Sequence, residues 1–185
     1  MKKTVLLLAD HFEEIEALTP VDYLRRAGIN VTLASLGSTT VRSARGITVQ
    51  ADAELTTLTD TLFDAIIIPG GKGAWTIAES PQALDYIQMH YKHNKLIAGI
   101  CAAPALVLGK ALCLLSNKKY TCYPGLEKES PCGIYVDIPV IQDGIILTAR
   151  GPGASGLFAL AIIAALLNKD NAQEIAKTTL TLGDF

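Results

Sequence analysis

The sequence predicts an α/β protein with a doubly wound, mostly parallel sheet that is covered by helices on both faces. Two observations lead to this fold class. Short apolar segments of strand length alternate along the chain with longer segments of helical periodicity. The apolar segments are nearly continuous, which is typical of strands buried on both faces of a parallel sheet. With 185 residues, 50% of them hydrophobic, the chain is expected to form a single domain over residues 1–185.

Strands and helices alternate over most of the chain. The predicted strands are residues 4–9, 30–35, 63–68, 95–100 and 144–148. The predicted helices are residues 14–27, 81–93, 103–112 and 154–167. Residues 41–52 carry turn residues and alternating apolar residues, which predicts a pair of short antiparallel strands added to the sheet. The polar stretch 116–135 is expected to form a short strand, a loop and a helical turn beside the active face.

Composition and charge argue against several classes of protein. A net charge of −2 offers no basic surface for nucleic acid. The apolar run at residues 157–167 is too short to span a membrane, and Asp10 interrupts the first apolar segment too soon for a signal peptide. We therefore expect a cytoplasmic protein with neither a membrane nor a nucleic-acid partner. The 4 cysteines are then expected to stay reduced, and their irregular spacing predicts no metal site.

Cys101 lies where a nucleophile is expected. A buried strand ends directly before it, and a helix that opens with Pro104 follows. Such a turn aims the thiol at solvent and at the positive end of a helix dipole, which lowers the pKa of a thiol. A free cysteine is also often a small buried hydrophobic residue, so the position alone leaves both interpretations open. Cys113, in contrast, is expected on the apolar face of a helix and to be inert.

Three segments follow strands at the carboxyl edge of the predicted sheet, where open α/β sheets bind their ligands. They are residues 10–16, residues 70–73 and Cys101. Glycine lets the main chain approach a ligand closely. The N–H groups of Gly70, Gly71 and Ala102 are therefore expected to form an oxyanion hole.

The histidines all precede Cys101, whereas a Cys–His hydrolase of the nucleophile-elbow type places its histidine after the nucleophile. His90 and His93 fall near the end of a helix and are expected to be solvated. His11 lies in a loop at the ligand-binding edge of the sheet, which makes it a second candidate for proton transfer.

A glycine-rich motif raises the question of a cofactor. Residues 151–156 match Gly-x-Gly-x-x-Gly between a strand and a helix, which is the context of a dinucleotide site. No strand follows that helix, so the chain offers no strand-end acid to hold a ribose. The segment is therefore interpreted as a tight strand–helix turn, and we predict no cofactor.

Several segments together carry a family resemblance. They are residues 13–16, 20–22, 25–29, 68–71, 99–104 and 148–153. In this combination they resemble the ThiJ/PfpI superfamily, and most of all its branch of parkinsonism-associated protein deglycases. The resemblance is collinear over nearly the whole chain, and it implies a flavodoxin-like fold and a homodimer. It also implies that Cys101 is the reactive cysteine, that Glu16 is a buried acid hydrogen-bonded to its sulfur, and that the three main-chain donors surround it.

Two positions depart from the pattern of this superfamily. Tyr123 precedes Pro124 where the deglycase branch has a His-Pro pair, so a phenol replaces an imidazole near the cysteine. Ala102 follows Cys101 where the protease-like branch has a Cys-His pair, which argues against peptidase activity.

The prediction is a cysteine-dependent glyoxalase III-like or deglycase enzyme that acts on methylglyoxal-like dicarbonyls or their adducts with amines. In this mechanism Cys101 adds to the aldehyde and Glu16 moves the proton. Besides Tyr123, Arg45 from its own or a second subunit and Arg150 are candidate neighbours of the site. The alternative is a non-enzymatic redox sensor or redox-regulated chaperone of the oxidative stress response, in which the same thiol is oxidised to a sulfinic acid.

Overall fold

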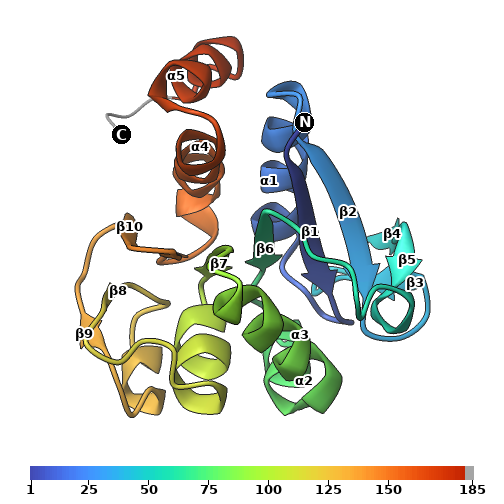
Figure 1. Ribbon diagram of the computed structural model, residues 1–185, viewed down its shortest axis with the longest axis vertical. Coiled ribbons are helices and arrows are strands. Elements are labelled where there is room, and N and C mark those ends of the chain that lie inside the picture. Colours follow the sequence, from blue (N-terminus) through green and yellow to red (C-terminus); the bar gives the residue numbers. More distant parts are fainter. Residues whose placement is uncertain (182–185) are drawn as a thin grey trace.

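A computed structural model describes residues 1–181 of the chain. Its centre is a seven-stranded sheet with the strand order β10-β11-β7-β6-β1-β2-β5 (Figure 1). Six of these strands run parallel, and β10 pairs with β11 in the antiparallel direction. The strands are β1 (Lys3–Leu8), β2 (Asn30–Ser35), β5 (Ala53–Glu54), β6 (Ala65–Ile68), β7 (Leu96–Ile100), β10 (Val140–Asp143) and β11 (Ile146–Ala149). The mostly parallel, flavodoxin-like sheet confirms the predicted fold class.

Helices cover both faces of this sheet (Figure 1). On one face lie α1 (Glu14–Arg26), α4 (Ser155–Leu166) and α5 (Lys169–Thr178). On the other face lie α2 (Gly73–Glu79), α3 (Pro81–Lys92) and the π-helix η2 (Pro104–Ala111). Short 3₁₀ turns connect some elements: η1 (Leu55–Thr57), η3 (Leu126–Glu129) and η4 (Pro152–Ala154). None of the helices within residues 1–181 is long and apolar enough to cross a membrane.

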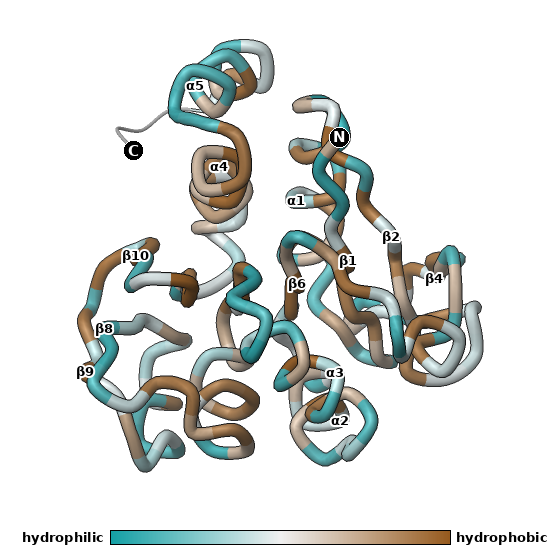
Figure 2. The backbone as a smooth tube through the Cα atoms, viewed as in Figure 1, coloured by the Kyte–Doolittle hydropathy of each residue, from teal (hydrophilic) through white to brown (hydrophobic). Residues whose placement is uncertain are grey.

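The sheet supplies the centre of two hydrophobic cores. Residues 5–8 of β1 are fully buried, with Leu6 and Leu8 in one core and Val5 and Leu7 in the other. Fully burying one such side chain stabilises the fold by roughly 1.5–3 kcal/mol. Both α4 and α5 pack in the core that contains Leu6 and Leu8, and in Figure 2 α4 is mostly hydrophobic while α5 is largely hydrophilic. Because β1 contributes side chains to both cores, this central parallel strand needs a continuous apolar run.

The structure corrects the predicted hairpin. Residues 41–52 do contain two antiparallel strands, β3 (Thr40–Arg42) and β4 (Thr48–Gln50). These strands form a sheet of their own and do not pair with the central sheet, where the short β5 occupies the edge instead. The periodicity correctly predicted the pairing of the two strands with each other. It carried no information on which partner the hairpin would face.

Further differences concern helices and a histidine. The helix after Cys101 has π-helical geometry, and α2 and α5 were not predicted. Helix α2 begins with a glycine, which is a poor helix former. Helix α5 follows the N-cap residue Asn168, whose side chain accepts a hydrogen bond from the N–H of Asn171 at 2.9 Å.

His90 was expected to be solvated, but it is fully buried against Phe63, whose N–H donates to Nε2 at 3.1 Å. His93 is exposed, as predicted.

The polar stretch 116–135 forms a second small sheet next to the central one. Strands β8 (Lys119–Tyr120) and β9 (Ile134–Tyr135) pair in parallel, and η3 lies between them in the chain. The main-chain N–H of Tyr123 in this stretch donates to the carbonyl of Cys101 at 2.8 Å. The stretch therefore lies beside the edge of the sheet where β7 ends, as expected.

Candidate active site

Cys101 occupies a sharp turn between β7 and η2. Its φ angle is +63°, which is uncommon for a residue other than glycine. Two long-range hydrogen bonds hold this conformation: the N–H of Cys101 donates to the carbonyl of Ala149 at 2.9 Å, and its carbonyl accepts from Tyr123. Strained backbone of this kind is a feature of nucleophile turns, and the surrounding structure must impose it. The predicted strand-to-helix turn is confirmed.

Glu16 reaches the same place from the opposite side of the sheet edge. It lies in the first turns of α1 and is fully buried. Its Oε2 accepts a hydrogen bond of 2.8 Å from the N–H of Gly70, which follows β6. The carboxyl also lies close enough to the Cys101 thiol for each group to shift the pKa of the other. Three elements that are distant in the sequence thus meet at one carboxyl group.

Gly70 is the point at which these groups touch. A side-chain carbon at this position would lie 2.6 Å from Oε2 of Glu16 and 2.7 Å from Cβ of Cys101. Real carbon atoms do not approach other groups this closely. The absence of a side chain at Gly70 is therefore what allows the thiol and the carboxyl to come together over its backbone.

The pKa of Cys101, in its pair with Glu16, differs from the prediction. Burial raises the pKa of Glu16 to about 7, against an ordinary value of 4.5. Burial, followed by the neighbouring Glu16 carboxylate, raises the pKa of the Cys101 thiol as well, whereas the turn predicted a lowered one. The helix dipole is outweighed because the sulfur is only partly exposed and lies next to an acid. Interacting groups of this kind titrate as a unit, so above about pH 7 the pair retains one shared proton.

Two of the three expected main-chain donors point at the sulfur. The N–H groups of Gly71 and Ala102 lower the pKa of Cys101 and so favour its thiolate form. The N–H of Gly70 is instead taken by Glu16, so it does not belong to an oxyanion hole. Gly71 is also needed for its conformation, because its φ is +74° and a side-chain carbon there would lie 2.7 Å from the backbone nitrogen of Glu13.

A cavity of about 420 Å³ opens above the sulfur. Among the residues proposed from the sequence, His11, Arg45, Gly71, Ala102 and Tyr123 line it together with Cys101. The other lining residues were not named as site residues from the sequence, although two of them, Glu13 and Lys72, fall within the predicted ligand-binding segments 10–16 and 70–73; these residues are Glu13, Ala44, Lys72, Trp75 and Leu126. Trp75 lies in α2, and Lys72 directly precedes this helix, whose existence was not predicted. A volume of this size is typical of a site for a small molecule.

Arg45 is held in the cavity wall by the chain to which it belongs. Its N–H donates to the buried side chain of Glu14, which also accepts a hydrogen bond from Ser43. These two bonds attach the loop between β3 and β4 to the start of α1. Arg45 and Cys101 of the same chain therefore line one cavity.

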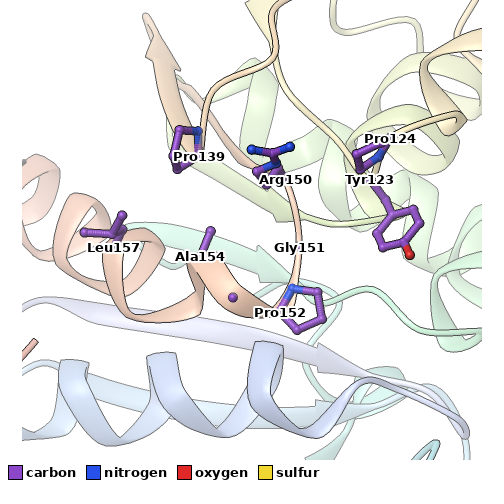
Figure 3. Close-up of a pocket in the computed structure, with 9 residues that line it drawn as sticks. Tyr123, Pro124, Pro139, Arg150, Gly151, Pro152, Ala154 and Leu157 are labelled. Carbon is purple, nitrogen blue, oxygen red and sulfur yellow. The ribbon is translucent and has the colours of Figure 1, made fainter. Parts of the chain in front are cut away.

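Arg150 does not line the Cys101 cavity. It lies in a neighbouring cavity of about 410 Å³, where Figure 3 shows it between Pro139 and Pro124. Its guanidinium forms an ion pair with Asp137 at 3.0 Å. The same cavity contains the glycine-rich segment 151–154, which forms the turn into α4, and Tyr123 separates the two cavities.

The other cysteines also differ from one another. Cys122 is fully buried, and burial raises its pKa to about 12. Cys113 was expected on an apolar helix face, but it lies beyond the end of η2, where its φ is +52° and its side chain is exposed. That prediction was wrong because the helix ends at Ala111, before it can turn Cys113 inward.

Known proteins share this architecture and sequence. Residues 2–165 match the DJ-1/PfpI family. The Arabidopsis thaliana protein DJ-1 homolog B is 38% identical over 95% of this chain, which spans only 40% of that protein's length. The Caenorhabditis elegans glutathione-independent glyoxalase DJR-1.2 is 31% identical over 94% of this chain and 92% of its own length.

Solved structures give the same result. The crystal structure of a cysteine-to-alanine mutant of a DJ-1 superfamily protein from Salmonella typhimurium superposes with a TM-score of 0.95 at 38% identity. The superposition covers 99% of this chain and 100% of that one. The family match extends from β1 to α4 and includes both Glu16 and Cys101. The chain therefore belongs to the DJ-1/PfpI family.

Proposed function

We propose that the protein is a cysteine-dependent, cofactor-independent enzyme of the glyoxalase or deglycase type. Its substrates are methylglyoxal-like dicarbonyls or the adducts that they form with amines. The observation that carries this proposal is the pair of a buried Glu16 and a partly buried Cys101 beneath an open cavity of about 420 Å³. A relative that is 31% identical and named a glutathione-independent glyoxalase supports the choice of reaction.

The first step uses the shared proton of the pair. With the proton on Glu16, the Cys101 thiolate attacks the aldehyde carbon and a carbon–sulfur bond forms. The electron pair of the carbonyl moves to oxygen, which takes the proton from Glu16 and yields a hemithioacetal. The N–H groups of Gly71 and Ala102 lie beside the sulfur and stabilise negative charge there and on the adjacent oxygen.

The second step moves a proton between carbons. The Glu16 carboxylate removes the proton from the carbon bonded to sulfur, which gives an enediol, and returns it to the neighbouring carbon, while the hydroxyl proton of the hemithioacetal passes to the former ketone oxygen. The aldehyde carbon is oxidised to a thioester while the ketone is reduced to an alcohol, so no external electron carrier is needed. Water then cleaves the thioester, which releases lactate and restores the thiol. A carboxyl with a pKa near 7 is suited to giving and taking the same proton.

The test is lactate formation from methylglyoxal by metal-free protein. Cys101→Ser is expected to reduce turnover to background, and Glu16→Gln to reduce it by roughly 10²–10⁴-fold, because Gln retains the hydrogen bond from Gly70 but carries no transferable proton. Retained turnover in Cys101→Ser would refute the proposal. Retained turnover in Glu16→Gln would move the base to His11 or Tyr123, two proton-carrying groups that line the cavity.

A second candidate function is that of a redox sensor or redox-regulated chaperone. The observation in its favour is that a protonated Glu16 and two main-chain N–H groups surround the sulfur and can donate to the oxygens of a sulfinate. Dicarbonyl turnover and aggregation of an unfolded client protein should be measured before and after mild peroxide treatment, with Cys101→Ser as the control. Protection that appears only after oxidation, without any turnover, would favour this second function.

We also expect a homodimer and a cytoplasmic location. Ile15 in α1 and Ile47 between β3 and β4 are 51% and 50% exposed, and both belong to segments that position the site. We expect these exposed apolar side chains to be buried between two copies of the chain. Sedimentation of the purified protein, compared with an Ile15→Lys variant, tests this expectation.

A further inference from the structure

A second pair of thiols, Cys113 and Cys132, lies at the opposite end of η2 from Cys101. Cys113 follows the C-terminal end of that helix, and Cys132 comes from the loop before β9. The two residues meet at one carbonyl group: the main-chain N–H of Cys113 donates to the oxygen of Gly109 at 3.0 Å, and the thiol of Cys132 donates to the same oxygen at 3.7 Å. The proposed catalytic chemistry uses neither cysteine.

The close approach of the two segments is built into the packing. A side-chain carbon at Gly109 would lie 2.7 Å from Cβ of Ser130, so the loop before β9 rests directly on the backbone of η2. Ser130 in turn donates to the carbonyl of Cys132 at 2.7 Å, which holds the backbone of Cys132 next to η2. The juxtaposition of the two cysteines therefore follows from contacts that do not involve sulfur.

Cys113 occupies a position where glycine is usual. The N–H of Leu114 donates to the carbonyl of Leu108 at 2.8 Å, and the N–H of Cys113 donates to the carbonyl of Gly109 at 3.0 Å, which together form a left-handed closing motif of this π-helix, with each bond one residue longer than in a Schellman motif. The αL residue of that motif costs a non-glycine side chain about 1–2 kcal/mol. With the backbone in this conformation, the exposed Cys113 thiol lies 3.5 Å from the hydroxyl of Ser116.

The two thiols differ in their environments. Hydrogen bonds from Ser116 and from Cys132 hold the pKa of Cys113 below its ordinary value. Burial and the hydrogen bond with Cys113 raise the pKa of Cys132. An exposed thiol that ionises readily, next to a partly covered thiol that does not, is the arrangement of an attacking and a resolving cysteine.

We propose that Cys113 and Cys132 form a reversible dithiol–disulfide site that exchanges with low-molecular-weight disulfides, independently of Cys101. The Cys113 thiolate attacks a sulfur of the small disulfide, forms a mixed disulfide and releases one thiolate. Deprotonated Cys132 then attacks the Cys113 sulfur, which closes the intrachain bond and releases the second thiolate. The protein loses two thiol protons and is oxidised, while the small disulfide is reduced to two thiols.

Closure of this bond has a consequence for the first site. The chain between the two cysteines carries Tyr123 and Leu126, both of which line the Cys101 cavity. A covalent bond between its ends restrains this segment. The oxidation state of the second pair is therefore coupled to the wall of the cavity and not to the reactive sulfur itself.

The test is a titration of the full-length protein with glutathione disulfide, followed by digestion with trypsin without reduction. The sequence is favourable, because cleavage after Lys95, Lys110, Lys118, Lys128 and Arg150 places each of the 4 cysteines on a different peptide. The expected product is peptide 111–118 joined to peptide 129–150 with the loss of two hydrogens. It should form equally in Cys101→Ser and Cys122→Ser and should disappear on reduction.

The variants sharpen this experiment. In Cys132→Ser, the peptide 111–118 is expected to keep its glutathione adduct, because no second thiol resolves it. In Cys113→Ser, the peptide 129–150 is expected to remain unmodified at the same concentration of oxidant. A wild-type protein that accumulates the glutathione adduct on Cys113 would overturn the proposal, as would a Cys113 bond to another chain or to Cys122. These outcomes are read from the wild-type protein and do not require any variant to fold.

Discussion

The main-chain N–H of Gly70 donates a hydrogen bond of 2.8 Å to Oε2 of the buried Glu16 side chain. This bond joins the end of β6 to α1 and fixes the orientation of a carboxyl that would otherwise be free to turn. It also assigns Gly70 a role different from that of Gly71 and Ala102, whose N–H groups point at the sulfur. The site thus consists of an acid held by Gly70 and a thiol whose pKa is lowered by the N–H groups of Gly71 and Ala102, the latter in the turn before η2.

Gly70→Ala is expected to damage both stability and activity. The added carbon overlaps Oε2 of Glu16 and Cβ of Cys101, so either the pair separates or the strand end shifts, at a cost of about 1–3 kcal/mol. Urea denaturation and methylglyoxal turnover measure the two effects. Gly37→Ala is the matched control, because a carbon there meets nothing within 4 Å and stability should be unchanged. Equal behaviour of the two variants would contradict the geometry of the pair.

The stability of the protein is expected to depend on pH through Glu16. Its pKa is raised by burial to about 7, so the folded state prefers the protonated carboxyl. This contribution is fully present below pH 4.5, the ordinary pKa, and is lost as the pH rises through about 7. The shift corresponds to roughly 3 kcal/mol. Between pH 5 and pH 8, Glu16→Gln should therefore gain stability relative to the wild type, and a pH-independent difference would be evidence against a buried acid.

Alkylation should distinguish the cysteines by their surroundings. At neutral pH, iodoacetamide is expected to label the exposed Cys113 first and the partly buried Cys101 more slowly, since a thiolate is the reacting species. Cys122 should react last, on the order of tenfold or more slowly, because it is fully buried and its pKa is about 12. Peptide mapping over time reads all three rates. Faster labelling of Cys101 than of Cys113 would instead support the lowered pKa of Cys101 that the strand-to-helix turn predicted.

His90 is expected to make the fold sensitive to acid. Its Nε2 accepts from Phe63, and its Nδ1 lies 2.9 Å from the carbonyl of Tyr86, so the ring is held neutral and burial lowers its pKa. The neutral ring stabilises the protein fully above pH 6.5, and this contribution is lost as the pH falls below that value. His90→Gln should show a weaker loss of stability between pH 7.5 and pH 5. His93→Gln is the exposed control and should behave like the wild type.

The sequence by itself determined the order of most strands and helices, the parallel sheet and the turn at Cys101. These features depend on local signals: continuous apolar runs of strand length, helical periodicity, and a cysteine between a strand and a proline. Collinear segments around Glu16, Gly70 and Cys101 carried the family resemblance. The family match and the superposition with known structures confirmed it.

Only the tertiary structure decided how the groups of the site interact. Whether Gly70 serves the substrate or Glu16, and whether Cys101 has a raised or a lowered pKa, depends on distances between segments that are far apart in the chain. The burial of His90 and the meeting of Cys113 with Cys132 are decided in the same way. Local sequence sets which hydrogen bonds a residue is able to make. Burial and the approach of other elements set which of them it does make and what charge it carries.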